Sequence, residues 1–206
     1  MLKELDGLSI VCFHDLTLYE QDKDDLDRLA ASGIWQWIGA NHRYNTLLWN
    51  EEDKARRTDV EAAEIAASKR LIDQYNQKRN DAIEALDEAI LTELSNVRLA
   101  NNARLNSETA GSMIDRLSIL ALKIFHMREQ TERKDVSANH IETCKKKLER
   151  LINQRQDLAS CFDNLLAEAA QGRAYFKVYR QFKMYNDPTL NPYLYQQSTG
   201  AGKRAS

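Results

Sequence analysis

The sequence predicts an all-α protein, an up-down bundle of four long helices with short N-terminal and C-terminal helical segments. Proline and glycine are scarce, at two and seven of the 206 residues. The chain is rich in Leu, Ala, Glu, Lys and Arg, which lose little rotamer freedom in a helix. Long stretches also place apolar side chains at helical spacing. An elongated coiled-coil dimer is the alternative, although the heptads are not strict enough to favour it.

The first half of the chain predicts three helical segments. Residues 5–18 are mostly apolar and predict a short helix or, as a second choice, an extended segment. An acidic stretch then opens a helix over about 24–57, which Gly33 breaks or bends. The four residues 58–61 have the spacing of a capping box. We therefore expect a second long helix to begin there and to end near Val97.

The second half predicts two more long helices. Residues 99–106 form a loop candidate, and a third helix begins near Ser107 or Thr109 and ends around Lys134. Ser137 is placed to cap the start of a fourth helix, which ends near Gln171. Gly172 then stands where a left-handed residue commonly ends a helix.

The remaining segment is shorter and mixed. Residues 175–180 combine aromatic and basic side chains and predict a short amphipathic helix. We assign one helical-bundle domain to residues 1–195. The Ser/Gly/Ala/Lys-rich residues 196–206 predict a disordered tail.

The composition argues against several classes of protein. A formal net charge of −2 argues against a nucleic-acid partner. No apolar run approaches the roughly 20 residues of a membrane span. The acidic first residues do not resemble a signal peptide, so we expect a soluble, cytoplasmic protein. Cys12, Cys144 and Cys161 lack zinc-site spacing, and we expect reduced, buried thiols.

Polar residues interrupt the apolar stripes of the first two long helices. These residues are His42, Asn45, Asp73, Asn76, Arg79 and Asn80. In an antiparallel hairpin that turns near Thr58, positions equidistant from the turn lie at one level, at about 1.5 Å of rise per residue. This geometry places His42, Asn45, Asp73 and Asn76 in one buried layer. The third helix brings Lys123 and His126 toward the same layer.

Such a layer is either a hydrogen-bonded network that fixes helix register or a ligand site, and the sequence leaves both interpretations open. Our first hypothesis is a protein that binds or processes a phosphorylated or nucleotide-linked sugar. The predicted ligand-binding residues are Asn45, Trp49, Arg70, Asn76, Asn80, Arg116 and His126. Arg70 and Arg116 would contact the phosphates. If the protein is an enzyme, His42 or Asp73 is the general base.

Two other hypotheses use different features. A non-enzymatic module would dock a protein partner, such as a glycosyltransferase, or form a homodimer through apolar faces. A magnesium-dependent nucleotide pyrophosphatase would hold Mg²⁺ with Glu52, Asp53 and Glu64. The sequence departs from the acidic motif of that enzyme class because Ala55 stands where an acid is required. Magnesium is the one cofactor that the sequence suggests.

Four segments of the chain resemble a bacterial family of unknown function, domain of unknown function four-two-five-four. They are HRYNTLLWNEEDKAR (42–56), KRLIDQYNQKRND (69–81), LNSET with IDRLSIL (105–109 and 114–120), and KVYRQFKMYND (177–187). The resemblance implies a bacterial helical protein with no established activity. It also implies a link to cell-envelope glycan synthesis, because members are often encoded near glycosyltransferases. It supplies no catalytic residues.

Overall fold

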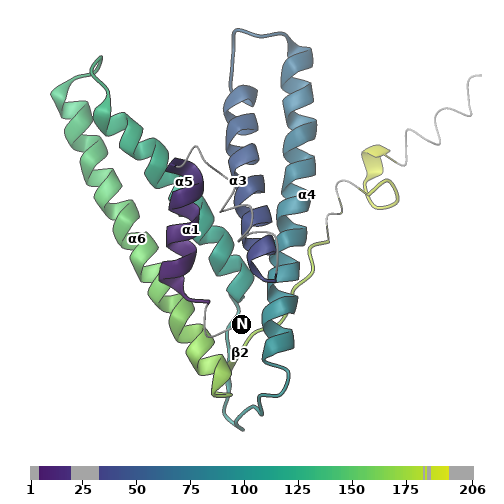
Figure 1. Ribbon diagram of the computed structural model, residues 1–206. Coiled ribbons are helices and arrows are strands. Elements are labelled where there is room, and N and C mark those ends of the chain that lie inside the picture. The colour runs from purple at the N-terminus through teal and green to yellow at the C-terminus, as the bar shows by residue number, and fades with distance from the viewer. Residues whose placement is uncertain (1–4, 20–32, 183, 185–186, 195–206) are drawn as a thin grey trace, which may run out of the picture.

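The computed structural model describes residues 5–19, 33–182, 184 and 187–194. It confirms an all-α bundle of four long helices with short terminal helical segments (Figure 1). The elements, in chain order, are α1 (Gly7–Tyr19), α3 (Trp35–Ala55), α4 (Ala62–Glu93), β1 (Arg104–Leu105), α5 (Ala110–Glu132), α6 (Ala138–Ala170) and β2 (Ala174–Tyr175). None of the described helices combines the length and apolarity needed to cross a bilayer.

The four long helices form two antiparallel hairpins. α3 packs along α4, and α5 packs along α6. Figure 1 shows the hairpins close together near β2 and spread apart toward their other ends. α1 lies against α5 and α6, while α5 also contacts α3 and α4. α5 is therefore the helix that joins the two hairpins.

Three predicted helix ends are confirmed. The Thr109 hydroxyl accepts the Ser112 amide (3.1 Å) at the start of α5. The Ser137 hydroxyl accepts the His140 amide (3.2 Å) at the start of α6. Gly172 has a φ of +69°, the left-handed conformation expected just past the end of α6.

The predicted capping box at 58–61 is wrong. α4 begins at Ala62, and its N-cap Glu61 makes no side-chain capping bond. The Arg57 guanidinium instead donates to both carboxylate oxygens of Asp59, at 3.1 and 2.9 Å. Local pairing of this kind satisfies the polar groups of the connection without extending the helix.

The predicted amphipathic helix over 175–180 is also wrong. Residues 174–175 form a strand that pairs in parallel with β1, in the register Arg104↔Ala174. The left-handed turn at Gly172 directs the chain back along the segment that precedes α5, where the Asn106 amide donates to the Tyr175 carbonyl (2.8 Å). Phe176 is buried in the core and anchors the extended segment. A helical turn occurs further along, at 192–194.

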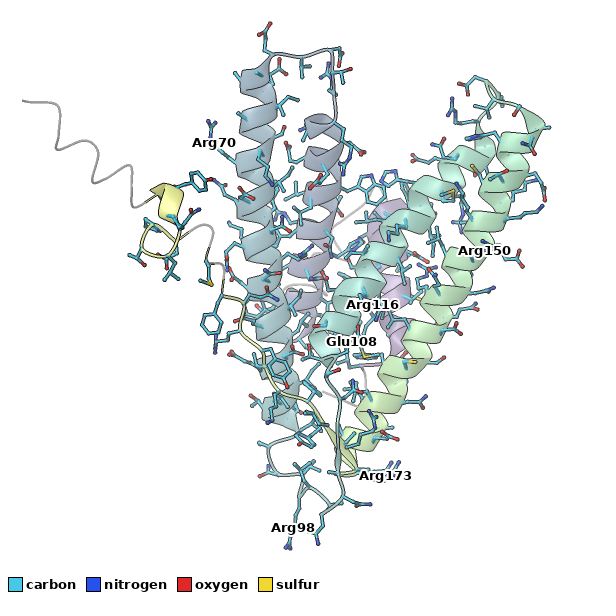
Figure 2. All side chains as sticks on the ribbon, turned by 180° about the vertical axis from the view of Figure 1, so that it is seen from behind. Arg70, Arg98, Glu108, Arg116, Arg150 and Arg173 are labelled. Atoms are coloured by element: carbon cyan, nitrogen blue, oxygen red, sulfur yellow. The ribbon has the colours of Figure 1, made fainter. Side chains whose placement is uncertain are left out.

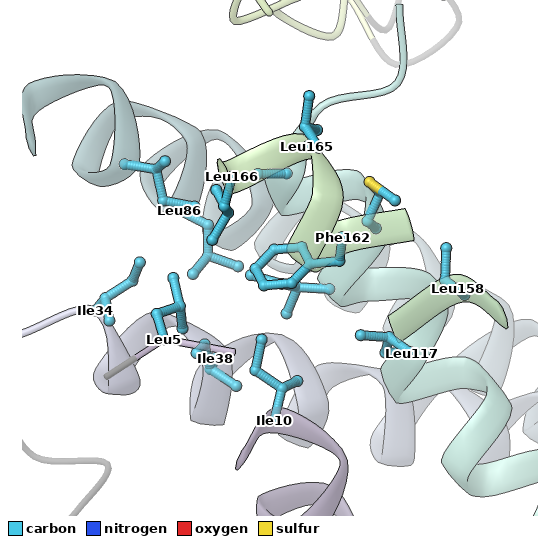
Figure 3. Packing of buried hydrophobic residues seen from close by; sticks show 14 of the residues in the cluster. Leu5, Ile10, Ile34, Ile38, Leu86, Leu117, Leu158, Phe162, Leu165 and Leu166 are labelled. Carbon is cyan, nitrogen blue, oxygen red and sulfur yellow. The ribbon is translucent and has the colours of Figure 1, made fainter. Parts of the chain in front are cut away.

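The core lies where α1, α5 and α6 meet the first half of α3 and the second half of α4. Figure 3 shows the Phe162 ring of α6 among Ile10, Leu117 and Leu158. Phe162 is fully buried, and burial of one such side chain contributes about 1.5 to 3 kcal/mol. The core therefore holds α1 against the α5–α6 hairpin.

The remaining expectations concern the cysteines and the segments outside the described residues. Cys144 is buried as expected, whereas Cys12 and Cys161 are exposed, because they lie on the outer faces of α1 and α6. The first part of the helix expected from about 24, and the tail 196–206, lie outside the described residues.

Gly172→Ala is expected to destabilise the protein by about 2 kcal/mol, because a side chain disfavours positive φ. Its Cβ would also lie 2.2 Å from the Arg98 carbonyl oxygen. Urea unfolding monitored by circular dichroism measures the change. Gln171→Ala, at the exposed neighbouring position, is the control and is expected to shift stability by less than about 0.5 kcal/mol. Equal stabilities of the two variants would contradict this prediction.

Candidate functional site

A buried polar network joins α3 to α5. Asp115 Oδ1 accepts hydrogen bonds from the side-chain amides of Asn41 and Asn45, each at 2.9 Å. Asn45 also donates to the Ser118 hydroxyl (3.0 Å), and His42 Nδ1 lies 2.8 Å from the same oxygen. All five side chains are buried. The helical spacing of 41, 42 and 45 places the three α3 residues on the face that meets α5.

A second histidine from α1 covers this network. The His14 imidazole stacks on the His42 ring, with centroids 4.5 Å apart and planes inclined by 24°. Among the described residues, neither nitrogen of His14 has a hydrogen-bond partner, and His42 Nε2 has none. Arg79 Nε of α4 lies 3.9 Å from Asp115 Oδ1 and partly balances its charge. Residues of four helices thus meet at one level.

Burial keeps both histidines neutral at pH 7. It lowers the pKa of His42 to about 4, although the Asp15 carboxylate opposes this shift. Burial also lowers the pKa of His14 well below its usual value, and the nearby His42 and Arg155 add to the effect. Arg155 donates to Asp15 at 2.5 and 3.1 Å. His14 therefore lies near the neutral His42 of α3 and the charged Arg155 of α6 without forming a hydrogen bond to either.

The sequence located only part of this network. His42 and Asn45 were predicted to be inside, and they are. Asn41, Asp115 and Ser118 were missed, although each interrupts an apolar stripe of α3 or α5. The interruption at Asp115 and Ser118, three residues apart between Ile114 and Leu122, was the available signal. The mutual hydrogen bonds favour the structural interpretation, in which the network fixes the register of α3 against α5.

The predicted position of Asp73 in the buried layer is wrong. Its side chain is 39% exposed, and its carboxylate lies 3.5 Å from Lys69 Nζ. Ile72, 2% exposed, occupies the inward position, and each residue turns the helix by about 100°. Asp73 therefore lies beside the buried face of α4 and outside the network. Asn76 is half-buried and forms none of the network hydrogen bonds.

The two arginines expected to contact the phosphates of one ligand are also apart. Figure 2 shows Arg70 on the outer side of α4, pointing away from the other helices, and Arg116 on α5. The Arg116 guanidinium donates to Glu108 at 2.5 Å. Since α4 turns Arg70 toward solvent, these two residues do not form a common anion site.

The three carboxylates predicted to hold magnesium do not gather. Glu52 pairs with Arg56 (2.9 Å) one turn further along α3. Glu64 is exposed in the first turn of α4, beyond the connection between the hairpin helices. Across the described ranges 5–19 and 33–194, with their gaps, no three His, Cys, Asp or Glu side chains lie close enough to hold a metal ion. The predicted magnesium site is therefore wrong in its geometry.

A cavity of about 560 Å³ lies between α3, α5 and α6, above the network. One wall is the Trp49 indole, which stacks on the His126 imidazole with centroids 4.6 Å apart and planes inclined by only 11°. His126 Nδ1 lies 2.8 Å from Glu129 Oε2, which also lines the cavity. Trp49 and His126 were both predicted as ligand-binding residues, and the structure brings them together.

Basic side chains from two helices surround this cavity. Lys123 comes from α5, while Lys147 and Arg150 come from α6. None of the three forms an ion pair with another described residue. The acidic lining consists of Glu129, held by His126, and Asp53 of α3. The sequence did not predict Lys147 and Arg150, because they are exposed and lie outside the apolar stripe of α6.

Asp115→Ala is expected to lower the free energy of unfolding by about 3 kcal/mol, because it leaves two buried amides without their acceptor. Asp73→Ala is the matched control: its ion pair is exposed, and a change below about 0.5 kcal/mol is expected. Chemical unfolding of both variants tests this. A larger loss of unfolding free energy in the Asp73 variant than in the Asp115 variant would show that Asp73 belongs to the buried layer.

The stacked histidines predict a loss of stability in acid. Because folding lowers their pKa values below 6.5, the unfolded chain binds more protons, and stability falls as the pH falls below 6.5. His42 alone contributes about 3 kcal/mol between pH 6.5 and 4. Asp87 has the opposite sign, because burial raises its pKa to about 6.

Replacing His14 by Leu isolates the histidine contribution, since His14 makes no hydrogen bond that the substitution would break. We expect a shallower decline of Tm between pH 6.5 and 4.5 than in the wild type. A decline as steep as that of the wild type would show that the stacked pair does not cause the acid sensitivity.

Comparison with known proteins identifies a family. No curated protein and no solved structure matches the chain. The family described as "Protein of unknown function (DUF4254)" matches residues 35–178, a range that includes all four long helices and both strands. This range is well over half of the 206-residue chain. The chain therefore belongs to the DUF4254 family.

Proposed function

We propose that this protein binds a phosphorylated small molecule in the cavity between α3, α5 and α6. The observation that carries the proposal is the cluster of three basic side chains, Lys123, Lys147 and Arg150, without ion-pair partners among the described residues. Side chains of this charge form strong hydrogen bonds to phosphate oxygens. Because they come from two helices, they surround the cavity rather than forming a stripe along one surface.

The size and the remaining walls of the cavity support a small-molecule ligand. Its volume of about 560 Å³ lies within the range of pockets that enclose drug-sized ligands. Trp49, Met127 and Leu151 provide apolar contact area, and Gln130 and Gln154 provide hydrogen-bonding groups. This combination suits a ligand with a ring and a phosphate. A nucleotide-linked sugar is such a ligand, and the family resemblance favours cell-envelope glycan metabolism as its source.

The proposal concerns binding and assigns no reaction. His42 and Asp73, the predicted general bases, do not line this cavity, and they lie in different environments. Their catalytic roles, and docking to a protein partner or homodimerisation, stay predictions.

Calorimetric titration with UDP and UDP-glucose tests the proposal. We expect the wild-type protein to bind at least one of them, more weakly as the salt concentration rises, because exposed charges are screened. Lys147→Glu is expected to weaken binding at least about tenfold, equivalent to about 1.4 kcal/mol.

Lys145→Glu is the matched control. It makes the same charge change on the same helix, at an exposed position that does not line the cavity. Binding is expected to survive this change. Equal loss in the two variants would show that the overall charge, and not the cavity, attracts the ligand. No binding of either compound to the wild type would contradict the proposal.

A further inference from the structure

A second, smaller cavity lies beside the start of α5. It has a volume of about 240 Å³ and is bounded by α4, by residues 107–112 and by the extended segment that follows β2. It shares no lining residue with the larger cavity. Its volume equals that of about eight water molecules, which is room for a ligand of single-ring size.

An asparagine without a partner lines this cavity. Asn80 of α4 is only 8% exposed, yet its side-chain amide forms no hydrogen bond to any residue in the described part of the chain. Its amide atoms are not among the fully shielded, unbonded polar atoms of the described residues, so they stay accessible from the cavity. By contrast, the neighbouring buried amides Asn41 and Asn45 are bonded. The Asn80 amide is therefore available to form hydrogen bonds with a ligand in the cavity.

Hydroxyl groups form the opposite wall. Ser107, Thr109 and Ser112 all line the cavity at the start of α5. The Thr109 hydroxyl donates to the Ser112 hydroxyl (2.9 Å) and accepts the Ser112 amide. Each hydroxyl has one donor and two acceptor lone pairs, so these groups keep unused capacity. The wall can therefore both donate to and accept from a hydroxylated ligand.

The charged residues of the cavity disfavour an anion. Its lining contains two carboxylates, Glu84 and Asp87, and no Lys, Arg or His. Asp87 accepts the Gly111 amide at 2.6 Å. Glu84 accepts from Arg180 (3.1 Å) and from the Gln181 amide (3.0 Å). These hydrogen bonds use part of the acceptor capacity of each carboxylate. The described residues provide no third ligand for a metal ion.

The segment after β2 closes one side. Arg180 bridges Glu84 and Glu88 of α4, the latter at 2.6 Å, and so ties the segment to the helix. Tyr179 and Gln181, on either side of Arg180, line the cavity. An aromatic ring and a primary amide beside a row of hydroxyls are groups that contact both the apolar face and the hydroxyls of a carbohydrate ring.

We propose that this cavity binds a small neutral polyhydroxylated ring, a monosaccharide or a cyclitol, whose hydroxyls bond to the Asn80 amide and to the hydroxyls at the start of α5. The free amide provides the hydrogen-bond donor, and the carboxylates of Glu84 and Asp87 accept ligand hydroxyl protons. This site is separate from the larger cavity proposed to bind phosphate, because the two share no lining residue.

Saturation-transfer NMR on the full chain with D-glucose, N-acetylglucosamine and myo-inositol tests the proposal. We expect transfer from the wild-type protein to at least one of them. Asn80→Ala is expected to raise the Kd for that compound at least about tenfold, by removing its hydrogen bonds to the ring. Asn76→Ala is the matched control, the same substitution one turn earlier on α4 at a position that does not line the cavity.

Tyr179→Ala serves as a second variant, because Tyr179 is exposed and outside the core and its loss leaves the bundle intact. It is also expected to weaken binding, whereas Lys147→Glu is expected to leave it unchanged. No transfer to any of the three compounds would overturn the proposal. Equal weakening by Asn76→Ala and Asn80→Ala, or weakening by Lys147→Glu, would do so as well. The last result would place the compound in the other cavity.

Discussion

The structure depends on one buried carboxylate. Asp115 receives two amide hydrogen bonds from α3 and lies near Arg79 of α4, so a single side chain of α5 links both helices of the first hairpin. Apolar packing between helices tolerates sliding and rotation, whereas hydrogen bonds between buried groups have a defined distance and direction. The network therefore fixes the level at which the two hairpins meet.

Fixing the hairpins at that level determines where the cavities form. The helices are close near β1 and β2 and diverge beyond the network (Figure 1). Above the network, aromatic and basic side chains of α3, α5 and α6 line the larger cavity. Below it, the start of α5 and the segment after β2 enclose the smaller one against α4. The two cavities differ in charge, with three cations around the first and two carboxylates in the second.

Buried ionisable groups occur at both contacts between the hairpins. His14 and His42 lie at the network. Asp87 lies near the end of α4 and accepts a hydrogen bond from the first turn of α5. Burial shifts the pKa of each group toward its neutral form, in opposite directions for a base and an acid. Their contributions to stability in acid therefore partly cancel. Gly111 allows the approach at Asp87, because a Cβ there would lie 2.6 Å from the Ile83 carbonyl oxygen.

The sequence by itself determined the four long helices, the caps at Thr109, Ser137 and Gly172, and the burial of His42 and Asn45. These features depend on local bonds and on the periodicity of one helix. Only the tertiary structure decided that Asp115 completes the network, that Asp73 lies outside it and that residues 174–175 form a strand. Each of these depends on how one helix is rotated against another, or on pairing between distant segments. A shift of one residue turns a helix by about 100°, so sequence spacing alone does not fix which side chains meet.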